Sequence, residues 1–220
     1  AGDPFDAGIQ EDGSVWMQIV DYYDYGNAKI SASSSGVIQT GKWQHIAFSS
    51  KKNQYTKAFV DGVEVASIAG SPQDNNSAPF EWLDGHDFDL KANMYVSNLR
   101  MTQATRYTGT FTPSFIHFPG FNGVKARDIT SLLMTGDYGN LATSFQENSN
   151  NQLSITTTGT GKISTEEFKF GSGSLALQAS TPNTAAYFTP NSSYNFGNGD
   201  FTIEFWFKAI GDAEPCGRII

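Results

Sequence analysis

Alternation of apolar and polar residues with a period of two is the feature that most limits how this chain can fold. Across residues 201–208 the odd positions are Phe, Ile, Phe and Phe, and the even positions are Thr, Glu, Trp and Lys. Successive side chains of a strand point to opposite faces of a sheet, so this pattern predicts a half-buried β-strand. The same reasoning predicts strands at residues 14–20, 43–48, 57–60, 94–100, 174–177 and 186–188.

The residues between these segments favour tight turns. Asp61-Gly62 separates two apolar runs, and an Asp-Gly pair supplies the positive φ angles of a two-residue type I′ hairpin turn. Asp12-Gly13, Asn122-Gly123 and Asn198-Gly199 predict further turns. No segment sustains apolar residues at the i, i+3, i+4 and i+7 spacing of a helix. The chain is therefore predicted to be all-β, as an antiparallel sandwich or barrel.

The amino-acid composition limits which kinds of partner and cross-link are expected for this chain. The 220 residues hold 14 Lys and Arg against 22 Asp and Glu, a net charge of -8, which disfavours binding to nucleic acid. No apolar run approaches the roughly 18 residues that a membrane helix needs, so no membrane insertion is expected. Cys216 is the single cysteine and can form neither an intrachain disulfide nor a cysteine zinc site.

Four motifs in the first half carry a resemblance to a known family. They are GKWQHIA at 41–47, AFVDG at 58–62, VSNLRMT at 96–102 and ATRYTGTFTP at 104–113. Together they resemble laminin-G-like members of the concanavalin A-like lectin/glucanase superfamily, with the closest likeness to copies in virion and tail-fibre proteins of marine phages. The resemblance implies an antiparallel jelly-roll β-sandwich.

The second half contains motifs similar to the opening strands of the same family: LLM at 132–134, FGSGSL at 170–175 and GDFTIEFW at 199–206. The order of the motifs is inverted relative to that of the family. Residues 1–118 resemble the C-terminal half of a family domain, residues 129–220 resemble its N-terminal half, and residues 119–128 form a linker between them. The chain is either a piece of a domain array or a set of halves that complete one domain. A bare half-sandwich would expose an apolar sheet face, so we expect both segments to supply strands to the same sheets.

Catalytic residues are not expected. Hydrolytic relatives in this superfamily use a Glu-x-Asp-x-x-Glu strand, because glycosidases need two carboxyl groups across the scissile bond. No Glu-x-Asp occurs in this chain; Glu204 has Trp206 at the i+2 position. Glu166 and Glu167 are adjacent and would point to opposite faces of a strand. We therefore expect no enzymatic activity.

One run of residues has the chemistry of a sugar site: Asp21, Tyr22, Tyr23, Asp24 and Tyr25. Aromatic rings stack on the C–H faces of sugars, and carboxylates accept hydrogen bonds from hydroxyls. Trp82 would add a further ring. The plainer interpretation is a strand that ends in a turn.

A second acidic cluster predicts a calcium site. Asp84, Asp87 and Asp89 supply oxygen atoms that suit Ca²⁺, although the EF-hand spacing is absent and the alternative is a solvated acidic loop. No other cofactor is expected.

The resemblance implies a structural or adhesion module on the virion surface, in a phage appendage or surface protein, and the missing carboxylate pair predicts that this module is non-enzymatic. The expected partners are other virion proteins or copies of the chain itself, and a host-surface polysaccharide. A secreted bacterial carbohydrate-binding or adhesion module and, less in keeping with the missing carboxylate pair, a glycosidase are the alternatives.

Overall fold

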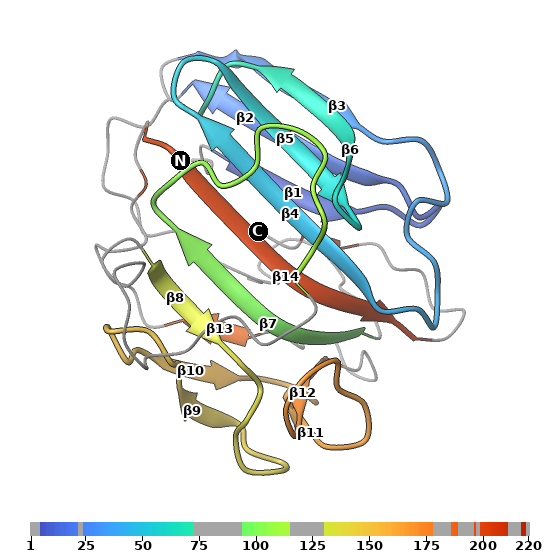
Figure 1. The fold of residues 1–220 in the computed structure, drawn as a ribbon, viewed down its shortest axis with the longest axis vertical. Coiled ribbons are helices and arrows are strands. Elements are labelled where there is room, and N and C mark those ends of the chain that lie inside the picture. Colours follow the sequence, from blue (N-terminus) through green and yellow to red (C-terminus); the bar gives the residue numbers. More distant parts are fainter. Residues whose placement is uncertain are drawn as a thin grey trace.

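β-Strands are the only regular secondary structure in the part of the chain that the structure describes (Figure 1). The computed structural model describes residues 5–21, 24–72, 94–114, 130–177, 186–188, 196, 199–210 and 217–218. Their strands pair antiparallel in three sheets of eight, four and three strands. The sheets pack as a sandwich, so the predicted all-β antiparallel fold is confirmed.

The eight-stranded sheet has the order β11-β12-β7-β14-β4-β5-β6, with β8 also paired to β7. Its strands are β4 (Gln44–Lys51), β5 (Tyr55–Val60), β6 (Val63–Ala69), β7 (Met94–Thr102), β8 (Thr130–Met134), β11 (Lys162–Ser164), β12 (Ser174–Leu177) and β14 (Phe201–Ala209).

The two smaller sheets have the orders β15-β1-β2-β3 and β13-β10-β9. Their strands are β1 (Phe5–Ile9), β2 (Val15–Asp21), β3 (Asp24–Ala32), β9 (Ser144–Gln146), β10 (Ser154–Thr157), β13 (Ala186–Phe188) and β15 (Gly217–Arg218).

One core joins all three sheets. The Phe5 ring of the four-stranded sheet lies 5.8 Å from Phe48 and 5.3 Å from Phe201 of the eight-stranded sheet. Phe145 and Ile155 bring the three-stranded sheet into the same apolar cluster. Burying each such side chain contributes roughly 1.5–3 kcal/mol, so these contacts hold the layers together. β1–β3 lie behind β4–β6 in Figure 1.

Strand β14 lies at the centre of the eight-stranded sheet, between β4 and β7 (Figure 1). It comes from the second half of the sequence, whereas both its neighbours come from the first half. The short strand β15 likewise pairs with β1, at Gly8↔Arg218 and Ile9↔Gly217. Strands of both halves therefore share the larger two sheets, while the three-stranded sheet is built from residues of the second half. The assignment of 1–118 and 129–220 to opposite halves of a family domain stays a prediction, and residues 119–128 lie outside the described part.

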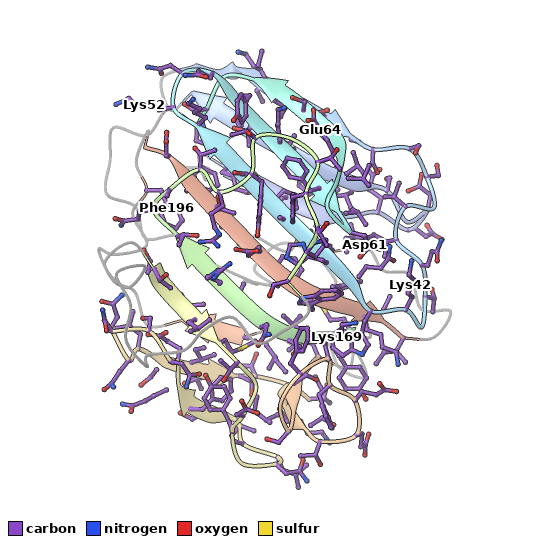
Figure 2. The ribbon with its side chains drawn as sticks, in the orientation of Figure 1. Lys42, Lys52, Asp61, Glu64, Lys169 and Phe196 are labelled. Atoms are coloured by element: carbon purple, nitrogen blue, oxygen red, sulfur yellow. The ribbon has the colours of Figure 1, made fainter. Side chains whose placement is uncertain are left out.

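The predicted hairpin turn at Asp61-Gly62 is confirmed. The two residues have φ angles of 50° and 81°, and Val60 pairs with Val63. The Asp61 carboxylate accepts the backbone N–H of His45 at 2.9 Å and lies 3.6 Å from Lys42 (Figure 2). Gly62 is required for a second reason, because a Cβ there would lie 1.9 Å from the carbonyl oxygen of Phe111.

The turn predicted at Asp12-Gly13 is also present, with the N–H of Gly13 donating to the carbonyl of Gln10 at 2.9 Å. The predicted turn at Asn122-Gly123 lies outside the described residues, as does Asn198.

Candidate functional site

The predicted sugar motif begins at the end of β2 and continues into β3. Asp21 ends β2, Asp24 begins β3, and these two residues pair with each other. Tyr22, Tyr23 and the side chains of Asp21, Asp24 and Tyr25 lie outside the described part of the structure. The place of the motif in the fold is thus known, while its role in sugar binding stays a prediction.

Trp82 and the predicted calcium ligands Asp84, Asp87 and Asp89 lie outside the described residues, so the calcium site also stays a prediction. Among the residues that are described, no three His, Cys, Asp or Glu side chains gather as a metal site would require. None of the described residues forms a helix long and apolar enough to cross a membrane.

A covering segment, residues 103–114, crosses the outer face of the eight-stranded sheet, which faces away from the core (Figure 1). Hydrogen bonds fix it to the strands beneath. Thr105 Oγ1 donates to the carbonyl of Ser50 at 2.7 Å, and the N–H of Arg106 donates to Thr202 Oγ1 at 3.0 Å. The backbone N–H of Phe111 donates to the carbonyl of Gly62 at 2.9 Å. These bonds explain why Ser and Thr residues are buried on this face.

Glu204 lies beneath the covering segment and is the centre of an ionic group, the Glu204 cluster, made of Glu204, Arg100 and His45 from the strands and Arg106 and Tyr107 from the covering segment. Glu204 is fully buried in the middle of β14. Its Oε1 atom accepts Arg100 Nε at 2.9 Å and Nη2 at 2.6 Å, and lies 3.1 Å from Arg106 Nε. Its Oε2 atom accepts the Tyr107 hydroxyl at 2.6 Å and lies 3.2 Å from His45 Nε2. The carboxylate is thus surrounded by donors on both oxygens.

The environment keeps Glu204 ionised. Burial on its own raises the pKa of this carboxyl, but the hydrogen bond from His45 and the charge of Arg100 outweigh it and lower the pKa to about 2. Burial and the negative charge of Glu204 raise the pKa of Tyr107 to about 12, so the phenol remains a hydrogen-bond donor. A general acid needs a raised pKa, whereas Glu204 has the lowered pKa of an ion-pair partner.

Aromatic rings pack against the inner side of this cluster, while the Arg106 side chain remains 31% exposed. Tyr107 stacks on Phe111 with 3.6 Å between ring centroids. The edge of Phe111 meets His45 at 5.7 Å and Phe59 at 5.4 Å. The low dielectric inside this packing strengthens the ion pairs and makes an unpaired charge there costly.

A second segment, residues 165–173, covers another part of the same face. Lys169, labelled in Figure 2, places its Nζ atom 4.3 Å from the centroid of the Trp206 ring. Phe170 meets that ring edge-on at 5.7 Å, and Lys208 pairs with Glu167 at 2.8 Å. Trp206 is only 3% exposed as a result. Glu204 and Trp206, the polar-face residues at the centre of β14, are both buried and are structural rather than ligand-facing.

The side chain of Glu147 is a second buried carboxylate, and it stabilises the structure by accepting backbone hydrogen bonds. It is 2% exposed, and it accepts the backbone N–H groups of Leu133, Ser149 and Leu153 at 3.0, 2.6 and 3.1 Å. These bonds fix the polar loop at 146–152 against β8. No sequence motif reveals this carboxylate, because its partners are backbone groups.

Comparison with known proteins supports the fold of the first half. Residues 2–100 match the family model described as the concanavalin A-like lectin/glucanases superfamily, a laminin-G-like model. No curated protein matches the chain, and no solved structure matches it. Residues 2–100 are thus similar to this superfamily, and the antiparallel sandwich is consistent with its fold. The match carries no information on a phage source.

Proposed function

We propose that this protein is a non-enzymatic adhesion module that binds neutral glycans on a host-cell surface. The superfamily that matches residues 2–100 includes sugar-binding and sugar-cleaving proteins. The arrangement of the carboxylates in this chain is what distinguishes a binding protein from a glycosidase. The state of Glu204 is the observation that carries the proposal, because this central carboxylate is fully buried and held by Arg100 and His45.

A glycosidase needs a pair of accessible carboxyl groups. The two lie roughly 5–5.5 Å apart in retaining enzymes and about 6.5–9.5 Å apart in inverting enzymes, and one has a raised pKa. Glu204 has a pKa lowered to about 2, and its strand offers Trp206 where the second carboxylate would stand. This arrangement favours binding over hydrolysis.

The charge of the chain favours a neutral ligand. With a net charge of -8, the protein would repel an acidic polysaccharide, so contacts should consist of ring stacking and hydrogen bonds. Millimolar sites, worth about -4 kcal/mol each, suffice when many copies bind one surface, because tethering raises the effective concentration.

The biological setting that we propose is a phage virion appendage, where other virion proteins or copies of the chain would be the partners. The support for this setting is the combination of the four first-half motifs and the FTIEFW segment at 201–206. An antibody raised against the protein should label virions in the source sample. Labelling confined to bacterial cells or culture medium would instead assign it to a secreted adhesion module.

A glycan array with the intact protein tests the binding function. We expect signal on neutral glycans that increases when the protein is presented in many copies, and no release of sugar fragments. Fragment release would assign a glycosidase, and the absence of binding to any glycan in the multivalent format would assign a scaffold.

A further inference from the structure

The outer face of the four-stranded sheet presents an aromatic side chain. Strand β2 alternates strictly, with Val15, Met17 and Ile19 in the core. Trp16 and Gln18 therefore point to the opposite, outer face and are half-buried. By contrast, Trp206 on the outer face of the eight-stranded sheet is 3% exposed beneath Lys169 and Phe170.

The cross-strand neighbours of Trp16 leave room beside its ring. Trp16 pairs with Gly8 of β1 on one side and with Ala32 of β3 on the other. Directly paired residues share a face, so the indole is flanked directly by the two smallest residues, and Arg218 of β15 follows beyond Gly8 in the same row. Gly8 is buried whereas Ala32 is exposed, so the side of the ring towards β3 is the one open to a ligand.

The next row along the strands adds hydrogen-bonding groups. Gln18 pairs with Asp6 of β1 and with Ile30 of β3. Ile30 is 65% exposed, which shows that this part of the face is open to solvent. A Gln amide both donates and accepts hydrogen bonds, and a carboxylate accepts them from hydroxyl groups. The two rows thus combine a stacking ring with groups that suit sugar hydroxyls.

We propose that this face, made of Asp6, Gly8, Trp16, Gln18, Ile30 and Ala32, binds a neutral oligosaccharide that stacks on Trp16 and bonds to Gln18 and Asp6. The inference rests on the proposed glycan-binding function and assigns it a site that the sequence did not reveal. The net charge of -8 and the Asp6 carboxylate disfavour an acidic chain. Only Trp16 and Ile30 are large and apolar in these two rows, fewer than the apolar core of a stable protein interface requires.

The predicted tyrosine motif begins at Asp21, the last residue of β2. Five residue steps, about 17 Å of strand, separate Asp21 from Trp16. A sugar chain that follows β2 from Trp16 would approach this end of the strand. An extended ligand is therefore favoured over a single sugar ring.

Titration of the intact protein with neutral hexasaccharides tests this site. The probes are maltohexaose, cellohexaose and xylohexaose, and the readouts are tryptophan fluorescence and amide chemical shifts. We expect at least one probe to bind the wild type with roughly millimolar affinity and to shift the amides of β1–β3. Trp16→Ala should weaken that binding at least tenfold, Trp16→Phe by only a few-fold, and Gln18→Ala by two- to five-fold.

Trp43→Ala is the matched control, because Trp43 is also half-buried but lies outside the four-stranded sheet, just before β4. It should leave the affinity unchanged. Thermal melting of every variant establishes that each is folded, and Trp16→Phe tests the ring even if Trp16→Ala fails to fold.

The two proposals fail in different ways. If the wild type binds a hexasaccharide and Trp16→Ala and Trp16→Phe bind it equally well, the site is wrong while the function stands. If no glycan binds the wild type in solution or on the multivalent array, both are wrong. If the wild type is a dimer in solution and Trp16→Ala makes it monomeric, the face is a contact between copies and the site is likewise wrong.

Discussion

Replacing Glu204 by Gln tests the buried ion cluster most sharply. The substitution keeps the shape of the side chain but removes the negative charge that Arg100 and Arg106 face at 2.6 and 3.1 Å. Arg100 is 8% exposed, so its guanidinium cannot be fully rehydrated in place. Removing one partner of a buried pair leaves an uncompensated charge and typically costs about 3–5 kcal/mol.

The lowered pKa of Glu204 gives a second value for the contribution of this carboxylate to the free energy of unfolding. Its pKa falls from 4.5 to about 2 on folding. At roughly 1.4 kcal/mol for each unit, this shift contributes about 3 kcal/mol to the free energy of unfolding at neutral pH. Because the folded pKa is lowered, the contribution is present above pH 4.5 and is lost as the pH falls towards 2. About 2 kcal/mol of it should be gone by pH 3.

Urea unfolding at pH 7 and pH 3 measures both quantities. We expect Glu204→Gln to lower the free energy of unfolding by about 3–5 kcal/mol at pH 7, and the gap to the wild type to narrow by about 2 kcal/mol at pH 3. Other carboxyl groups titrate in both proteins and cancel in the comparison. The control is Glu64→Gln, whose partner Lys57 lies at 2.8 Å while the Glu64 side chain remains 34% exposed. That change should cost less than about 1 kcal/mol.

Two results would refute this reasoning. One is a Glu204→Gln variant as stable as the Glu64→Gln control at pH 7. The other is a stability gap of the same size at both pH values, which would mean that the carboxylate is not held ionised by its neighbours.

Three further substitutions have defined outcomes. Tyr107→Phe keeps the stack on Phe111 but removes the hydroxyl bond to Glu204, so urea unfolding should show a loss of about 1.5–3 kcal/mol, and a loss below 0.5 kcal/mol would contradict the bond. Gly62→Val should lower the melting temperature by several degrees, since φ is 81° and the Cβ would meet Phe111; an unchanged melting temperature would mean another turn type. Leu141→Gly should raise stability by up to about 1 kcal/mol, because Leu141 has a φ of 64° and is 61% exposed; destabilisation would show that its side chain contributes more than its strain costs.

Local patterns predicted the strands whose side chains alternate. The period-two segment at 201–208 became β14 (Phe201–Ala209), and Asp61-Gly62 became the expected turn. Strand β3 (Asp24–Ala32) was missed because it contains Gly26 and Asn27, which are poor strand formers. Its pairing with β2 overrides that local preference.

The candidate sites depended on pairings that no local pattern contains. Glu204 was considered from its own strand alone, where its i+2 neighbour excluded a carboxylate pair. Its real partners come from β4, β7 and the covering segment, about a hundred or more positions away along the chain. Trp16 was likewise visible only as part of a strand, since its small neighbours Gly8 and Ala32 follow from register. Register between distant strands is a tertiary property, and this explains both omissions.

The central claim is that the protein binds glycans without cleaving them, and one incubation tests it. A neutral polysaccharide selected by array binding is mixed with the intact protein at pH 7, and free ligand and newly formed reducing ends are followed together. The account predicts saturable binding with a constant number of reducing ends over many hours. Reducing ends that increase in proportion to protein concentration, and that vanish in Glu204→Gln, would contradict it.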